Sequence, residues 1–161
     1  MYKKIMVPLD GSKLAECVLP HVDAFLTSFQ VETITFVRVI EPAPTRLSST
    51  TVPEDYGKIQ ENAKKIEAER KTAAAAYLNE VASRVKADGI KCREEVIVGK
   101  AAESLIDYVN TNEIDLILIA THGRSGISRW VRGSIADRVL RSSRVPVLMV
   151  RAAGTMSEEN A

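Results

Sequence analysis

Five short runs of apolar, mainly β-branched residues recur along this 161-residue chain, and the stretches between them place apolar residues at helical spacing. The runs cover residues 5–7, 34–40, 96–98, 114–119 and 145–150. Strands that alternate with helices predict β-α-β units, in which helices cover both faces of a mainly parallel sheet. We therefore expect an α/β fold, and the length suits one domain with a substantial core.

The first two stretches between these runs predict a short helix and a long one. The short helix has Ser12 as a candidate N-cap, and Pro20 inside its pattern predicts a kink or a distorted turn. Its apolar face is formed by Leu14, Val18, Val22, Phe25 and Phe29. The long helix has its apolar residues at positions 59–85 and stops at an Asp-Gly pair at 88–89.

Two further helices are expected over residues 101–112 and 134–142. The segment that starts at Glu41 and ends at Gly57 contains three prolines and a Ser-Ser-Thr-Thr run, which is typical of a long loop. Because this loop follows the second strand, two interpretations are open. It is a lid or partner-binding segment, or it is an ordinary surface loop.

Charge and cysteine content argue against several classes of function. The formal net charge of +1 gives no reason to expect binding to nucleic acid or to a membrane. Cys17 and Cys92 are too few for a disulfide framework and do not have metal-ligand spacing. The chain passes from Met1 straight into the first strand without a signal-peptide pattern, and no apolar run approaches ~20 residues. We expect a cytoplasmic protein.

The segment from Ala120 to Ser134 is the strongest candidate for a binding motif. A glycine-bearing loop between a buried strand and a helix gathers backbone N–H groups, and the helix dipole adds positive charge. Gly123 and Gly133 allow an anion to approach the backbone, and seven arginines lie between Ala120 and Arg151 against one acid. These features predict a phosphate cradle. The alternative is a tight strand-to-helix connection that binds nothing.

Other segments are predicted to meet this loop at one edge of the sheet, because ligands bind at the carboxyl ends of parallel strands. Asp10 ends the first strand, where its carboxylate could accept hydrogen bonds from a ribose or hold a metal with phosphates. It could equally cap the first helix. His122 is more typical of a loop hydrogen-bonder than of a catalyst, because no nucleophile is paired with it. We expect no catalytic residue.

With these residues in view, the chain resembles the universal stress protein family over nearly all of residues 2–151. The start Lys-Lys-Ile-Met-Val-Pro-Leu-Asp-Gly-Ser and the later Val-Gly-Lys-Ala-Ala-Glu at 98–103 match the family. Its ATP-binding branch has Gly, two residues, Gly, nine residues, then Gly with Ser or Thr. Gly123, nine residues, Gly133 and Ser134 fit this pattern, whereas Ala120 replaces the first glycine.

The resemblance implies a five-stranded parallel sheet of Rossmann-like form that binds ATP, alone or with Mg²⁺. It assigns the adenine and ribose end to Pro8, Leu9, Asp10 and Val39. It assigns the ribose and phosphate side to Ile119, Ala120, His122, Gly123 and Arg124, and the phosphates to Gly133, Ser134, Ile135 and Ala136. It also implies a homodimer through the last strand, which starts at Val145 and ends at Val150.

These implications favour a dimeric, nucleotide-dependent switch or sensor in the stress response, with a domain over residues 1–151 and a flexible tail over 152–161. Two alternatives stay open. One is a slow ATP-hydrolysing enzyme, or one that transfers an adenylyl or phosphoryl group. The other is a protein-interaction module that has lost its nucleotide. The sequence does not identify a protein partner.

Overall fold

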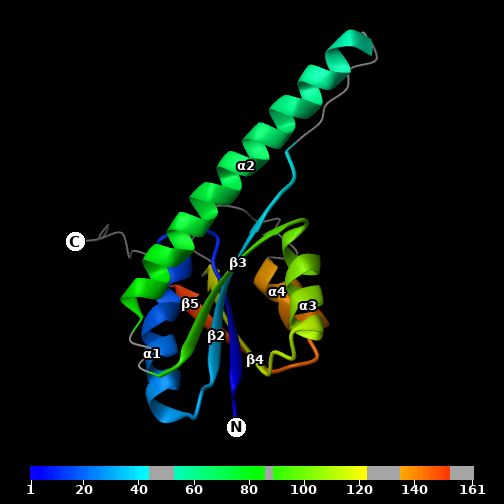
Figure 1. Ribbon diagram of the computed structural model, residues 1–161. Helices are drawn as coiled ribbons and strands as arrows, with labels where there is room; N and C mark the ends of the chain where they lie inside the picture. The colour runs from blue at the N-terminus through cyan, green and yellow to red at the C-terminus, as the bar shows by residue number, and fades with distance from the viewer. Residues whose placement is uncertain (44–52, 86–88, 123–134, 153–161) are drawn as a thin grey trace, which may run out of the picture.

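The computed structural model describes residues 1–43, 53–85, 89–122 and 135–152, and these form one five-stranded parallel sheet with helices packed around it (Figure 1). The elements in chain order are β1 (Lys4–Pro8), the 3-10 helix η1 (Ala15–Val18), α1 (Leu19–Ser28), β2 (Thr33–Ile40), α2 (Pro53–Arg84), β3 (Lys91–Val98), α3 (Ala101–Thr111), β4 (Leu116–His122), α4 (Ile135–Ser142) and β5 (Val147–Ala152).

The strand order β3-β2-β1-β4-β5 places β1 at the centre and confirms the predicted α/β class. Successive residues of a strand point to opposite faces, and both faces are buried. Ile5 and Val7 of β1 therefore pack with α1 and α2, whereas Met6 packs with α3 and α4. Burial on both sides explains why the strands are continuous apolar runs instead of alternating ones.

Several element boundaries differ from the sequence-based expectations. β3 begins at Lys91 instead of residue 96, because it is an edge strand whose first half is polar. β4 and β5 both extend beyond their apolar runs, and Ala152, which we assigned to the tail, is the buried last residue of β5. The predicted loop ending at Gly57 is wrong over residues 53–57, which are helical, because proline is well suited to the first position of a helix.

The distorted turn expected near Pro20 is present. η1 precedes α1, and Pro20 lies in the first turn of α1, where its missing N–H costs no intrahelical hydrogen bond. Ser12, our candidate N-cap, lies in the turn before η1, whose N-cap is Leu14. Its Oγ nevertheless accepts a hydrogen bond of 3.1 Å from the backbone N–H of Ala15, the first residue of η1. The chain therefore enters the first helical segment through a short, hydrogen-bonded turn.

α2 is 32 residues long and reaches far beyond the sheet, as Figure 1 shows. Its C-terminal half packs on the sheet through buried residues that include Ala74, Leu78 and Val81. In its first half the side chains of Tyr56 and Ile66 are exposed. No helix in the described ranges is both long enough and apolar enough to cross a membrane.

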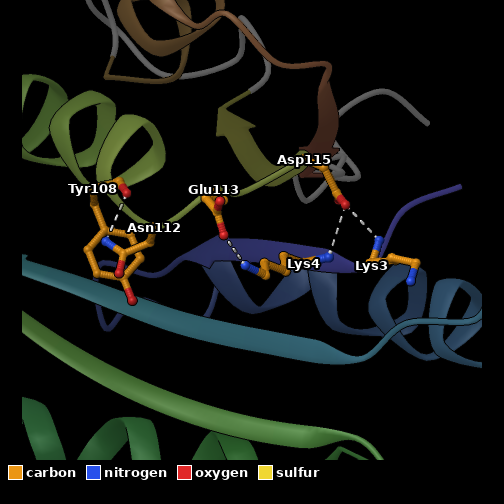
Figure 2. A network of polar contacts seen from close by, with 6 residues as sticks. All are labelled: Lys3, Lys4, Tyr108, Asn112, Glu113 and Asp115. Atoms are coloured by element: carbon orange, nitrogen blue, oxygen red, sulfur yellow. Dashed lines mark hydrogen bonds and ion pairs between the residues drawn. The ribbon is translucent and has the colours of Figure 1, made fainter.

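The amino end of the sheet is closed by a polar network (Figure 2). Asp115 Oδ2 accepts hydrogen bonds from the backbone N–H groups of Lys3 at 2.8 Å and Lys4 at 3.2 Å. The Lys4 ammonium forms an ion pair of 2.7 Å with Glu113, which lowers the pKa of that carboxyl. These contacts join the start of β1 to the residues just before β4.

Candidate functional site

A pocket of about 180 Å³ opens at the carboxyl ends of β1 and β4. The two strands are neighbours, but β1 continues into η1 and α1 on one face of the sheet and β4 leads toward α4 on the other. This divergence is the topological switch point at which open α/β sheets bind ligands. The pocket is lined by Pro8, Leu9, Asp10, Ala15, Val37, Val39, Ala101, Leu105, Ile119, Ala120, Thr121, Ile135 and Ala136.

Segments that are remote in sequence meet in this pocket. Of the residues that we assigned to the site, the pocket brings together Pro8, Leu9, Asp10, Val39, Ile119, Ala120, Ile135 and Ala136. The side chain of His122 and the residues Gly123, Arg124, Gly133 and Ser134 lie outside the described residues. The phosphate cradle therefore stays a prediction.

Sequence reasoning missed some of the lining. Val37 is two residues before Val39 on β2, so the period of a strand places both side chains on the pocket face. Ala101 and Leu105 are four residues apart at the start of α3, on its inward face. Both spacings are visible in the sequence. No comparable spacing in the sequence marks Ala15 or Thr121 as a lining residue.

Among the residues that the structure describes, the lining is apolar apart from two side chains, those of Asp10 and Thr121. Both also border a smaller cavity of about 30 Å³ beside the pocket. The Ser12 backbone N–H donates a hydrogen bond of 2.8 Å to Asp10 Oδ1, so the carboxylate closes the turn after β1 while it lines the pocket. The alternative that Asp10 caps the first helix is wrong, because the residues at the N-cap positions of η1 and α1 are Leu14 and Val18. The binding role of Asp10 stays a prediction.

An ion pair links the two helices that enclose the pocket from the α3–α4 face. The Arg138 guanidinium of α4 donates to Glu103 in the first turn of α3. The Glu103 backbone N–H and then Arg138 hold the pKa of this carboxyl below its ordinary value. On α4, Arg141 pairs with Asp137 at 3.0 Å. Two of the arginines in the C-terminal basic region therefore have acidic partners within the fold.

The described residues offer little to a protein-bound metal. They contain no cluster of three or more His, Cys, Asp or Glu side chains that could hold an ion. Asp10 is the one carboxylate in the described lining of the pocket. From the described residues, a Mg²⁺ ion here would draw its oxygen ligands from Asp10, water and the phosphates of a ligand.

Comparisons with known proteins give a consistent result. The model of the universal stress protein family matches residues 1–151. Universal stress protein MJ0577 of Methanocaldococcus jannaschii is 26% identical over 156 residues, covering 94% of this chain and 96% of that protein. A solved structure of MJ0577 has a TM-score of 0.76 at 24% identity, covering 96% of this chain and 99% of that chain.

Two further solved structures share the fold and contain nucleotides. A universal stress protein in complex with cAMP has a TM-score of 0.65 at 21% identity, covering 94% of this chain and 98% of that chain. A family member from Arabidopsis thaliana with AMP bound has a TM-score of 0.57 at 14% identity, covering 94% of this chain and 93% of that chain. At these identities the likeness establishes the architecture alone.

Proposed function

Because this chain belongs to the universal stress protein family, we propose that it is a nucleotide-dependent switch that binds ATP in the pocket between β1 and β4. The observation that carries the proposal is the composition of that pocket. A largely apolar pocket lies at the switch point of the sheet, with one carboxylate, that of Asp10, among its described lining residues. Specific small-molecule sites typically combine apolar walls with a few placed polar groups.

The apolar walls of the pocket suit the base of a nucleoside, and its carboxylate suits the ribose. The walls formed by Val37, Val39 and Leu105 would contact the faces of an adenine ring. Asp10 would accept hydrogen bonds from ribose hydroxyls, because an ionised carboxylate is an acceptor only. The phosphates would then leave toward residues 123–134, where the glycine spacing predicts a cradle of backbone N–H groups.

Adenine nucleotides are favoured as the ligand class by the relatives that contain cAMP and AMP. We propose ATP in particular because Gly123, Gly133 and Ser134 fit the pattern of the family's ATP-binding branch. Mg²⁺ would enter with the phosphates, and Asp10 is its nearest candidate protein ligand in the described lining.

We also propose that two copies pair through β5, the edge strand whose partner on the other side is β4. Several of its apolar side chains are incompletely covered, since Leu148 is exposed and Val147 and Met149 are half-buried, although the exposed Arg151 is charged. An exposed apolar edge is a template for pairing with another strand. A cytoplasmic location is part of the proposal, because Cys17 and Cys92 are both free thiols.

Identification of the ligand in purified protein tests this function. Mass spectrometry of the denatured protein should release ATP or its products, and added ATP should raise the melting temperature of emptied protein. Val39→Phe should fill the pocket and weaken ATP binding about 100-fold, because a ring would occupy the base position. Ile90→Phe, at a half-buried site just before β3, is the matched control and should bind normally.

Failure of wild-type protein to bind any adenine nucleotide would contradict the proposal. Equal weakening by Val39→Phe and Ile90→Phe would contradict the location of the site. Measurement of phosphate release in the same samples separates a binding switch from an ATP-hydrolysing enzyme, since a switch of this kind releases phosphate at the background rate.

A further inference from the structure

Arg38 lies on β2 between Val37 and Val39, two residues that line the pocket. Because side chains alternate along a strand, Arg38 lies on the opposite face of the sheet, where α2 packs. Its Cζ atom is 5.2 Å from the centre of the Tyr77 ring of α2, which is the geometry of a cation–π contact. Arg38 is therefore not a direct contact of the proposed ligand.

The guanidinium of Arg38 also packs against Gly11, in the turn that follows β1. A Cβ atom placed on Gly11 would lie 2.9 Å from Cζ and Nη2 of Arg38 and 3.0 Å from Nη1. Three nearly equal distances mean that the flat face of the guanidinium lies against the glycine. Gly11 has a φ of +87°, a conformation that side chains disfavour, so this position suits glycine in two independent ways.

Contacts on both sides of Asp10 hold its backbone in place. Before it, the Leu9 N–H donates a hydrogen bond of 2.9 Å to the Val37 carbonyl of β2. After it, Gly11 rests on Arg38, and the Ser12 N–H donates to the Asp10 carboxylate. The turn that presents Asp10 to the pocket is thus supported by two successive residues of the same strand, Val37 and Arg38.

The charges around Arg38 indicate that its position does not come from an ion pair. No ion pair joins Arg38 to an acid in the part of the chain that the structure describes. Glu16, an acidic group close to Tyr77, is paired with Arg84 at 3.0 Å and with Lys13 at 3.7 Å. Aromatic stacking and the fit against Gly11 are the contacts that place the guanidinium.

We propose that Arg38 is a positioning residue of the nucleotide site, which, stacked on Tyr77, supports the Gly11 turn and thereby fixes the Asp10 carboxylate at the pocket. The inference rests on the proposed function and adds a residue that does not touch the ligand. It also connects α2 to the pocket, because Tyr77 belongs to that helix.

A double-mutant cycle tests the proposal by calorimetric titration of emptied protein with ATP. Arg38→Met keeps an unbranched side chain without the charge or the flat surface, and it should weaken binding about tenfold. Asp10→Ala should weaken binding at least as much. If Arg38 acts through Asp10, the double variant should bind no more weakly than Asp10→Ala alone, since residues that act together are not additive.

Arg93→Met is the matched control, because Arg93 is an exposed arginine on the neighbouring strand β3. It should bind ATP like the wild type. In ligand-free protein the NMR amide resonance of Ser12, which donates to Asp10, should shift in Arg38→Met and stay in place in Arg93→Met. Loss of overall stability would not by itself produce such a local shift.

The outcomes separate the two proposals. Wild-type protein that binds no nucleotide contradicts the proposed function. Wild-type binding together with unchanged ATP affinity in Arg38→Met contradicts the role of Arg38 alone. The role of Arg38 is also overturned if the fold-loss of ATP affinity in the double variant equals the product of the losses in Arg38→Met and Asp10→Ala, and the Ser12 amide resonance does not shift. The two residues would then act independently.

Discussion

The two ends of the sheet are built from the same strands but in opposite ways. At the amino end, carboxylates tie the strands together: Asp115 Oδ2 accepts hydrogen bonds from the backbone N–H groups of Lys3 and Lys4, and Glu113 pairs with the Lys4 ammonium. At the carboxyl end, the strands open into a pocket whose described walls are apolar apart from Asp10 and Thr121.

This difference separates stability from binding within one small domain. At the amino end, the hydrogen bonds of Asp115 Oδ2 and the ion pair of Glu113 hold the start of β1 to the start of β4, so their loss weakens the fold. Asp115 Oδ1 is buried without a hydrogen-bond partner among the described residues. The carboxyl end keeps apolar surface and a carboxylate available at the switch point. Substitutions at the amino end should therefore lower the stability of the fold, whereas substitutions at the carboxyl end should change ATP affinity.

The largest effect on stability is expected for Asp115→Ala. It removes the acceptor of two backbone N–H groups and should lower the free energy of unfolding by about 2 kcal/mol. Denaturant titration measures the loss, and ATP affinity should stay at the wild-type value. Glu113→Gln is the control and should leave stability nearly unchanged, because its ion pair is exposed to solvent. A marked loss of ATP binding in Asp115→Ala would break the separation of the two ends.

Gly11→Ala should cost about 1 kcal/mol of stability, since alanine disfavours a φ of +87°. Gly89→Ala is a close control: its φ is +75°, but no atom of the described part of the chain, its neighbours in sequence aside, lies within 4 Å of the added methyl group. Both variants should lose similar stability, measured by thermal unfolding. In Gly11→Ala the methyl group should also displace Arg38, so that ATP affinity falls in this variant alone. Equal ATP affinity in the two variants would contradict the coupling of the turn to the pocket.

The smallest effect concerns alkaline pH at the carboxyl end. Burial, and then the charges of Glu16 and Asp10, raises the pKa of Tyr77 to about 12 from an ordinary value of 10.0. Between these values the folded protein keeps a proton that the unfolded chain loses, so stability should fall as pH rises through this window. Tyr77→Phe removes this contribution, and denaturant titrations of both proteins across the window should show a shallower slope for the variant. An identical slope would mean that Tyr77 is not shielded in the fold.

Much of the fold could be predicted because the strands are buried on both faces. The runs that became β1, β2 and β4 stand out for this reason, and so does the inward face of α3. The first half of β3 was missed because it contains the polar residues Lys91, Arg93 and Glu94, which an edge strand tolerates. A search for apolar runs does not detect such a segment.

The part of the candidate site that lies at the ends of strands was predictable from the sequence. Asp10 and Val39 follow from the topology alone, because parallel strands end at one edge. The contact of Arg38 with Gly11 was not predictable, because it depends on how α2 crosses the sheet and where it places Tyr77. Such a contact between remote segments leaves no local pattern in the sequence.

Chemical-shift mapping can show whether ATP binds at the carboxyl end of the sheet, because it follows both ends in one experiment. ATP is titrated into emptied, isotope-labelled protein, and the backbone amide resonances are followed. If ATP binds in the pocket between β1 and β4, the resonances of Asp10, Val39 and Thr121 should shift strongly, while those of Lys4, Glu113 and Asp115 stay in place. Shifts that gather at the amino end, or saturation with ATP in excess without any change around Asp10, would contradict binding in this pocket.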